Sequence, residues 1–160
     1  MKGILLDTGI LVDYLRYLRK SRPKNDRQAF LSQHAASLIE DFIQKEVPIY
    51  TTVHTLKELL QYPRISPEEE KRILEDIPIF CKVIGTGRRV AKIAGLLSRQ
   101  SVEYREHHIE DCYIAAIAIA RGLPLYTTNS KDFNYVKHNK LIVFQPYEYK
   151  ETEPGPATKS

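Results

Sequence analysis

The amino-acid sequence predicts an α/β fold, a three-layer α/β/α sandwich with a central parallel sheet. Short apolar segments of strand length alternate with amphipathic segments of helix length along most of the chain. Such alternation is typical of parallel sheets whose two faces are covered by helices. The chain has 160 residues and is 42% hydrophobic, enough for one core, so we expect one domain over residues 1–149. The polar residues 150–160 are expected to be a disordered tail.

The first elements are a strand and two helices. Residues 3–6 are short and apolar and stop at Asp7, which indicates a buried strand. Apolar residues at helical spacing predict helices over residues 8–18 and 28–45. The segment between these helices, residues 19–27, carries five basic residues and no apolar period, so we expect a mobile loop.

The next elements are a strand over residues 48–51 and a helix that carries Glu58. Either Thr52 or Thr55 can cap that helix, because a threonine side chain can accept a hydrogen bond from a free backbone N–H of the first turn. Ser, Pro and Glu at the start of residues 66–76 are typical of a helix N-terminus. The same criteria predict, in order, strand 79–84, helix 88–99, helix 109–121, strand 123–127 and strand 141–144.

Charge and cysteine content narrow the function only a little. The formal charge of +4 and pI of about 9.0 suit a polyanionic partner, but carry little weight alone. Cys81 and Cys112 lie in apolar stretches and are interpreted as buried thiols. The apolar run before Asp7 is too short for a signal peptide, and no run has the ~20 apolar residues of a membrane span. We therefore expect a cytoplasmic protein without a membrane segment.

Four acids stand beside segments that are predicted to be core. In parallel α/β folds, ligands bind where the strands end, and the chain direction takes most of these acids to that edge. Burying an unpaired charge is costly, and clustered carboxylates raise the pKa of one another. A divalent cation removes both costs. The four acids are Asp7, Glu58, Asp111 and Asp132.

Oxygen ligands of this kind favour Mg²⁺ or Mn²⁺. Such ions lower the pKa of bound water and stabilise charge on a phosphate, so carboxylates alone suffice for phosphodiester hydrolysis. Asp111 opens a helix that is apolar nearly all round, and an acid in the first turn is favoured by the helix dipole. The pattern therefore indicates a metal-dependent hydrolase of phosphodiesters.

Each acid also has an ordinary interpretation when taken singly. Asp7 could cap the following helix, Glu58 could be solvated, Asp111 could be a helix-terminal charge and Asp132 a turn acid. The adjacent His107 and His108 cannot share a helix face, which disfavours a zinc site there. The basic residues of the 19–27 loop could contact phosphates, or could simply be solvated.

Four segments together carry a family resemblance. They resemble the PIN domain family, and within it the VapC-type toxin ribonucleases, over about residues 3–144 of the chain. Any one motif is weak, whereas all four in order are fairly specific. The segments are Leu5-Leu6-Asp7-Thr8, Glu58-Leu59-Leu60, Asp111-Cys112-Tyr113-Ile114-Ala115-Ala116 and Thr127-Thr128-Asn129-Ser130-Lys131-Asp132-Phe133.

The resemblance implies an α/β/α sandwich, Mg²⁺ or Mn²⁺, cleavage of single-stranded RNA to leave a 5′-phosphate, homodimers, and for toxins a co-encoded antitoxin. By position, Asp7, Glu58 and Asp111 match the core metal-site acids. The fourth polar position stays open between Asn129 and Asp132, and Asp132 is carried as a second-sphere or water-bridged ligand. Supporting positions are matched by Thr8 and Thr127. Gly9 departs from the Ser or Asn often found in the family.

Two other functions remain open from the sequence. One is a housekeeping RNA-processing nuclease with the same fold, which differs from a toxin in lacking an adjacent antitoxin gene. The other is a non-catalytic PIN-like interaction module whose acids bind a basic peptide. Retention of all four motif positions argues against the second alternative. The RNA target and the number of metal ions do not follow from the sequence.

Overall fold

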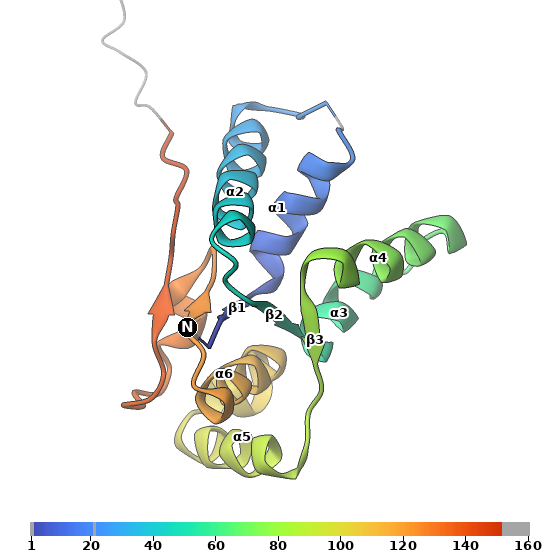
Figure 1. Cartoon of the computed structure of the whole chain (residues 1–160). Coiled ribbons are helices and arrows are strands. Elements are labelled where there is room, and N and C mark those ends of the chain that lie inside the picture. The colour runs from blue at the N-terminus through green and yellow to red at the C-terminus, as the bar shows by residue number, and fades with distance from the viewer. Residues whose placement is uncertain (1, 21, 152–160) are drawn as a thin grey trace, which may run out of the picture.

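The computed structural model describes residues 2–20 and 22–151 (Figure 1). The predicted tail falls outside the described residues from residue 152 onward, and so does Ser21 of the predicted loop. The elements are, in chain order, β1 (Ile4–Leu6), α1 (Thr8–Leu18), α2 (Asp26–Gln44), β2 (Ile49–Thr52), α3 (Val53–Leu60), α4 (Pro67–Phe80), β3 (Lys82–Ile84), α5 (Arg88–Gln100), the π-helix η1 (Glu103–His107), α6 (Ile109–Arg121), β4 (Leu125–Tyr126), the 3₁₀-helix η2 (Ser130–Phe133) and β5 (Val143–Phe144).

The five strands form one parallel sheet in the order β3-β2-β1-β4-β5. The predicted α/β architecture with a central parallel sheet is therefore confirmed. The chain starts in the middle of the sheet, adds β2 and β3 on one side, then returns to add β4 and β5 on the other. In such sheets the crevice between the two halves opens at the carboxyl ends of the strands, here between β1 and β4.

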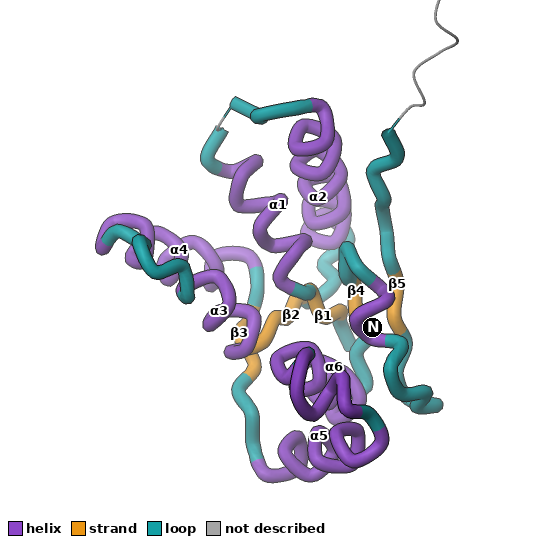
Figure 2. The backbone as a smooth tube through the Cα atoms, turned by 180° about the vertical axis from the view of Figure 1, so that it is seen from behind, coloured by secondary structure: helices purple, strands orange, loops and turns teal. Residues whose placement is uncertain are grey.

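Alternate residues of β1 serve the two faces of the sheet. Leu5 packs in a cluster with α5 and α6, whereas Ile4 and Leu6 pack in a second cluster with α1 and α2. Figures 1 and 2 show the α1–α2 pair on one side of the strands and the α5–α6 pair on the other. A strand buried on both faces is continuously apolar, which explains why residues 3–6 lack the alternation of a half-buried strand.

Helix α6 is the most deeply buried helix. Seven of its residues are buried, and three of these are the small Ala115, Ala116 and Ala118, which bring the helix axis close to the sheet. Gly122 ends the helix in the left-handed conformation with φ of 64°, as the sequence predicts. Among the described helices, none is long and apolar enough to cross a membrane.

The structure corrects several element boundaries. The predicted strand 79–84 starts only at Lys82, because α4 continues through Pro78 to Phe80. Ile73 and Ile77 are buried four residues apart, whereas Ile79 is 80% exposed, which is the pattern of a helix rather than a strand. Helix α2 begins at Asp26, so it takes over the end of the predicted 19–27 loop. The two short helices η1 and η2 were not predicted.

Candidate metal centre

Asp7 stands where β1 ends and α1 begins. It caps α1: its Oδ1 accepts the backbone N–H of Thr8 at 2.7 Å. Its other oxygen, Oδ2, accepts the hydroxyl of Thr127 at 2.8 Å. Thr127 follows β4, the strand beside β1, so the crevice of the sheet sets the spacing of the two side chains. The capping interpretation of Asp7 is correct as far as it goes, and it leaves lone pairs of both oxygens free.

The Asp7 carboxylate is buried without a cationic partner. The residue is 8% exposed, and none of the ion pairs formed by residues 2–20 and 22–151 involves it. Burial raises the pKa of Asp7 to about 6, the Thr127 and Thr8 hydrogen bonds lower it, and the charges of Glu58 and Asp132 raise it. The charged form of Asp7 thus has hydrogen-bond donors but no cationic side chain to balance its charge.

Glu58 reaches the same place from α3. The Thr8 hydroxyl donates to Glu58 Oε1 at 2.9 Å, which links the first turn of α1 to the last turns of α3. The helix is fixed by its cap, because Thr52 Oγ1 accepts the N–H of Thr55 at 3.1 Å. Burial raises the pKa of Glu58, and the neighbouring charge of Asp111 adds to the rise.

Asp111 completes a group of three acids. Oxygen atoms of Asp7, Glu58 and Asp111 all lie within 4.8 Å of one another, a spacing that one metal ion can bridge. Burial raises the pKa of Asp111 to about 6, and the charges of Asp7 and Asp132 contribute, against a lowering hydrogen bond from His108. Asp7 caps α1, whereas Glu58 lies in α3 and Asp111 in α6, and the three acids meet at the carboxyl edge of the sheet.

Asp132 lies beside this group rather than in it. Its Oδ2 accepts the side-chain amide of Asn129 at 3.0 Å, and the Asn129 backbone N–H donates to Thr127 Oγ1 at 3.0 Å. Asn129 therefore connects Asp132 to the hydroxyl that holds Asp7. The structure brings together all seven side chains that the sequence selected. Asn129 and Asp132 both belong to this network, with Asn129 as the bridge between Thr127 and Asp132.

His108 is a further member of the site that the sequence analysis missed. Its Nδ1 lies 3.0 Å from Asp111 Oδ2 and 3.8 Å from Asp132 Oδ1. The argument against a zinc site treated His107 and His108 as a pair, and His107 is indeed exposed. The signal that could have identified His108 is its position three residues before Asp111, one helical turn away.

The unusual glycine at position 9 also has a structural reason. A Cβ built on Gly9 would lie 2.1 Å from Thr128 Oγ1 and 3.3 Å from Thr128 Cβ. The absence of a side chain at position 9 lets the segment after β4 approach the first turn of α1 closely. That approach accompanies the Thr127–Asp7 hydrogen bond in the neighbouring residues.

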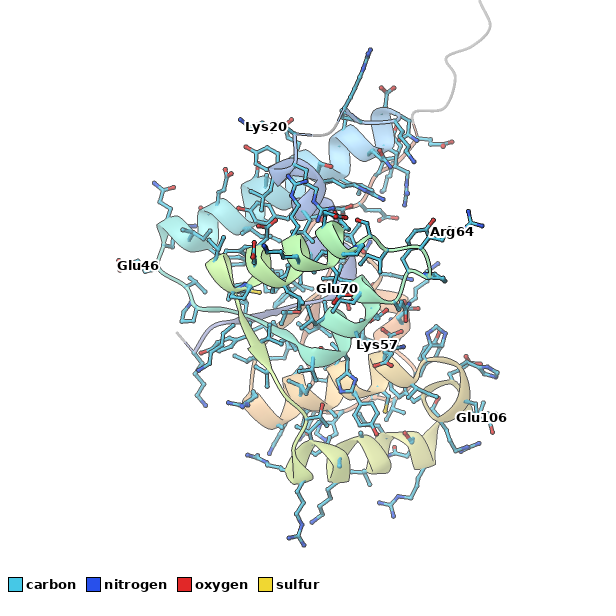
Figure 3. The ribbon with its side chains drawn as sticks, turned by 90° about the vertical axis from the view of Figure 1, so that its right-hand side faces the viewer. Lys20, Glu46, Lys57, Arg64, Glu70 and Glu106 are labelled. Atoms are coloured by element: carbon cyan, nitrogen blue, oxygen red, sulfur yellow. The ribbon has the colours of Figure 1, made fainter. Side chains whose placement is uncertain are left out.

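Glu110, which precedes Asp111 in the sequence, has its charge balanced by neighbouring side chains. Lys57 Nζ lies 3.2 Å from Glu110 Oε1, and His54 Nδ1 lies 2.7 Å from Glu110 Oε2. Figure 3 shows Lys57 on α3, between α4 with Glu70 and the α5–α6 layer. Glu110 therefore has two partners, in contrast to Asp7, which has hydroxyl and N–H donors only.

Comparison with known proteins agrees with this architecture. Residues 4–139 match the family model of the PIN domain. Comparison with curated protein sequences gives no significant match. Among solved structures, a toxin-antitoxin complex from Klebsiella pneumoniae is similar with a TM-score of 0.62 and 24% identity, over 92% of this chain and 100% of that chain.

Two further solved structures have the same fold. FitAcB from Neisseria gonorrhoeae has a TM-score of 0.64 and 20% identity, over 89% of this chain and 97% of that chain. DNA-bound VapBC from Salmonella typhimurium has a TM-score of 0.59 and 19% identity, over 92% of this chain and 100% of that chain. At these identities the likeness shows the fold.

The sheet order and the acidic group define an α/β protein with a site suited to a divalent cation. The family match covers most of the chain, and the chain belongs to the PIN domain family. The resemblance that the sequence motifs indicated is confirmed. PIN domains are generally nucleases, and the acidic cluster found here is of the kind that nucleases use to bind metal.

Proposed function

We propose that the protein is a Mg²⁺- or Mn²⁺-dependent endoribonuclease that cleaves single-stranded RNA, acting as the toxin of a type II toxin-antitoxin pair. The observation that carries the proposal is the convergence of Asp7, Glu58 and Asp111 within 4.8 Å at the carboxyl edge of a PIN-domain sheet. Three acids from three separate segments of the chain have no mutual attraction. Their convergence is best explained by a cation that they share.

The residues present fit such a cation. Asp7 and Glu58 are held by Thr8 and Thr127 through single hydrogen bonds, so lone pairs of the carboxylates remain free for an ion. Asp7, Glu58 and Asp111 would hold the ion, and Asp132 would stand beside them with its orientation set by Asn129. A bound divalent cation lowers the pKa of water and neutralises charge that develops on a phosphate.

A basic cavity beside the site supports an anionic, polymeric substrate. The cavity has a volume of about 640 Å³ and lies between α1, α2, the segment after β4 and the C-terminal segment. Arg16, Arg27 and Lys131 line it, together with the acids Asp13 and Glu148. It borders Asn129, so a phosphate backbone that passes the acids would meet these basic side chains next. Arg27 comes from the segment whose basic residues raised the phosphate-binding interpretation.

The toxin role is inferred from the relatives, whereas the homodimer is carried over from the family resemblance of the sequence motifs. The solved structures with this fold include toxin-antitoxin complexes, which supports a co-encoded antitoxin for this chain. A housekeeping nuclease would have the same catalytic acids. A small adjacent reading frame with a DNA-binding start favours the toxin, and its absence favours the housekeeping role.

The decisive experiment is the substitution Asp7→Asn, assayed on an end-labelled single-stranded RNA with Mg²⁺ or Mn²⁺. We expect the cleavage rate to fall by at least about 100-fold, because one of three ion ligands loses its charge. Asp41→Asn is the matched control, since Asp41 is an exposed acid of α2 away from the site, and its cleavage rate should not change.

Equal cleavage by wild-type protein and the Asp7→Asn variant would end the proposal. Cleavage that persists in excess EDTA would contradict the metal requirement. A non-catalytic module predicts no cleavage by either protein and tight binding of a basic peptide, which calorimetry would detect.

A further inference from the structure

A second basic cavity lies at the end of α1 that points away from the sheet. It has a volume of about 540 Å³ and is formed by the last turns of α1, the connection to α2 and the first turns of α2 (Figure 1). Figure 3 shows Lys20 at this outer end of the molecule, opposite Glu106. Four of the lining side chains are basic and none is acidic, whereas the cavity beside the acids has two carboxylates in its lining. The four basic residues are Arg16, Lys20, Arg22 and Lys24.

Three of these cations have no acidic partner. Lys20, Arg22 and Lys24 take part in none of the ion pairs formed within residues 2–20 and 22–151. Arg16 approaches Asp13 only to 4.0 Å. Basic side chains that gather around a cavity without a balancing carboxylate create a positive potential there, which favours an anionic occupant.

The connection that carries the cations is anchored at both ends. Arg19, the C-cap residue of α1, forms an ion pair with Glu69 of α4. At the other end, Gln28 Oε1 accepts the backbone N–H of Lys24 at 2.9 Å, and the Gln28 N–H donates to Asn25 Oδ1 at 2.8 Å. Because these contacts already order the backbone, a ligand that binds here meets a smaller entropic cost.

An exposed aromatic ring stands among the cations. Tyr17 lines the cavity and is 42% exposed. Its ring stacks on that of Tyr14, with centroids 6.1 Å apart and 14° between the planes, and the buried Tyr14 packs in turn on Phe80 at 4.9 Å. The exposed ring is thus supported by the core. Proteins bind single-stranded nucleic acid with this combination, in which bases stack on aromatic rings and cations meet the phosphates.

Helix α1 connects the cavity to the acidic site. Arg16 lines both this cavity and the basic cavity that borders Asn129. The 11 residues of α1 span about 16 Å, and Asp7 caps the other end of the helix. A stacked strand rises about 3.4 Å per nucleotide, so about five nucleotides cover the length of α1.

We propose that this cavity is a second binding site for the RNA strand, about five nucleotides from the bond that is cleaved, in which the cations contact phosphates and Tyr17 stacks on a base. The inference deepens the proposed function and rests on it, because the strand bound here is the strand that passes the acids. It implies a substrate with at least about five unpaired nucleotides on one side of the cleaved bond. An acidic peptide would match the cations but has no base to stack on the ring.

Fluorescence anisotropy with a labelled single-stranded RNA of about 12 nucleotides tests the site, in EDTA so that no cleavage occurs. The triple variant Lys20→Gln/Arg22→Gln/Lys24→Gln should bind this RNA about 10-fold more weakly than the wild type. Each phosphate contact on a single strand contributes about 0.7 to the dependence of log K on log salt, so the slope should fall by about 2.

The matched control removes the same charge from α5, on the opposite side of the molecule (Figure 1). It is the triple variant Arg88→Gln/Arg89→Gln/Lys92→Gln, whose three side chains are also exposed. Its affinity and salt slope should stay close to those of the wild type. Equal losses in the two triple variants would mean that RNA responds only to the net charge of the protein, which overturns the site.

The aromatic ring is tested separately. Tyr17→Ala should weaken binding by about 10-fold, whereas Tyr17→Phe keeps the ring and should bind as the wild type does. Tyr62→Ala, at a tyrosine that is 62% exposed after α3, is the control and should not change the affinity. Wild-type affinity in a folded Tyr17→Ala variant overturns the stacking role, and circular dichroism checks the fold. Should that variant unfold, the exposed cations of the triple variant decide the question.

The same assay separates RNA from an acidic peptide. A glutamate peptide of equal charge should displace the RNA from the wild-type protein at least about 10-fold less well than unlabelled RNA does, because it lacks bases. Displacement at equal concentration would assign the cavity to an acidic peptide and overturn the RNA site.

The failures of this inference and of the proposed function are distinguishable. In cleavage assays with Mg²⁺ or Mn²⁺, the triple variant at positions 20, 22 and 24 should raise KM about 10-fold more for RNA of about 12 nucleotides than for RNA of about four. Cleavage with the same KM in the wild type and this variant overturns the second site alone. Wild-type protein that binds RNA through Tyr17 and the cations but does not cleave it overturns the proposed nuclease and supports the second site.

Discussion

The Asp7 carboxylate is a buried charge that should lower the stability of the protein when no cation is bound. It is buried, it has two hydrogen-bond donors, and it has two acids as its charged neighbours. Active sites commonly contain groups whose environment is unfavourable until the ligand binds. The metal-free protein should therefore be less stable than a variant that lacks this charge.

The substitution Asp7→Asn should stabilise the metal-free protein at neutral pH. The pKa of Asp7 is about 6 in the folded protein against an ordinary 3.8, so the folded state retains the proton between these values. The resulting stability is fully present below about pH 4 and is lost as the pH rises through 6. Since each pKa unit corresponds to about 1.4 kcal/mol, the variant should gain about 3 kcal/mol at pH 7.5.

Urea denaturation in EDTA at pH 4.5 and 7.5 measures this difference. The variant should show a weaker decline in stability between the two pH values, with the remaining decline due to Asp111, whose pKa is also about 6, and to Glu58, whose pKa is also raised. Asp41→Asn should follow the wild-type curve. A variant less stable than the wild type at pH 7.5 would show that the charged carboxylate is stabilising.

The sequence identified the acidic residues of the site but did not identify the neighbouring histidine, His108. Chain direction takes these acids to one sheet edge, because Asp7 follows β1, Glu58 lies in the helix after β2, and Asp111 opens the helix that leads into β4. His108 was not identified from the sequence, because its orientation depends on a π-helix that adds a residue to the turn before α6. A one-residue widening of a turn has no apolar period by which the sequence could reveal it.

At the scale of a single element, the cap of α3 links stability to the site. The sequence left the cap open between Thr52 and Thr55, and the structure assigns it to Thr52, which is fully buried. Thr55 instead supplies the N–H that the cap accepts. Because α3 carries Glu58, fraying of the first turn of α3 should displace the Glu58 carboxylate from the other two acids.

The substitution Thr52→Ala should cost about 1–2 kcal/mol and weaken Mn²⁺ binding. The loss leaves a buried N–H unpaired in the helix that positions Glu58. Ser66→Ala is the matched control, because Ser66 caps α4 in the same way, with Glu69 N–H at 3.0 Å, and α4 carries none of the site acids. Denaturation and calorimetry should show two destabilised proteins, of which only Thr52→Ala has weaker Mn²⁺ binding. Equal Mn²⁺ affinities in the two variants would contradict the link.

Helix α4 shows where local patterns fail at this scale. A proline usually ends a helix, and the apolar residues around Pro78 resemble a short strand. The boundary is decided instead by burial of Ile73 and Ile77 on one helix face, which depends on packing against the second core cluster. Tertiary packing of this kind leaves no local signal.

At the scale of the whole molecule, the C-terminal segment that follows β5 contacts α1 and α2. The Tyr147 hydroxyl donates to Asp13 Oδ2 at 2.9 Å, and the Tyr149 ring packs on Phe30 of α2 with centroids 5.4 Å apart. Asp13 is buried, and its nearest basic partner, Arg16 Nη1, lies 4.0 Å away. A contact spanning 134 residues of sequence thereby closes one side of the sandwich.

The substitution Tyr147→Phe should destabilise the protein by about 2 kcal/mol, because it leaves a buried carboxylate without its hydroxyl donor. Tyr149→Phe removes a hydroxyl from the same segment and should change the free energy of unfolding by less than about 0.5 kcal/mol. Thermal and urea denaturation provide the comparison. Equal effects of the two substitutions would mean that the Tyr147–Asp13 hydrogen bond contributes nothing specific.

The overall architecture was predictable and the strand order was not. Alternating strands and helices imply a parallel sheet with helices on both faces, whatever the order of its strands. The order β3-β2-β1-β4-β5 depends on which crossovers pass over which face, and no residue pattern in the sequence states it. That order places Asp7 beside Thr127 and so allows the hydrogen bond between them, which the sequence motifs did not predict.

The bare backbone at Gly9 has an evolutionary consequence. The space that a methyl group would need there is already filled by the hydroxyl of Thr128, 119 positions further along the chain. The effect of a substitution at position 9 therefore depends on the residue at position 128, and the reverse also holds. Descendants of this gene that gain a side chain at position 9 should carry a smaller residue at position 128, as a covarying pair beside the acidic site.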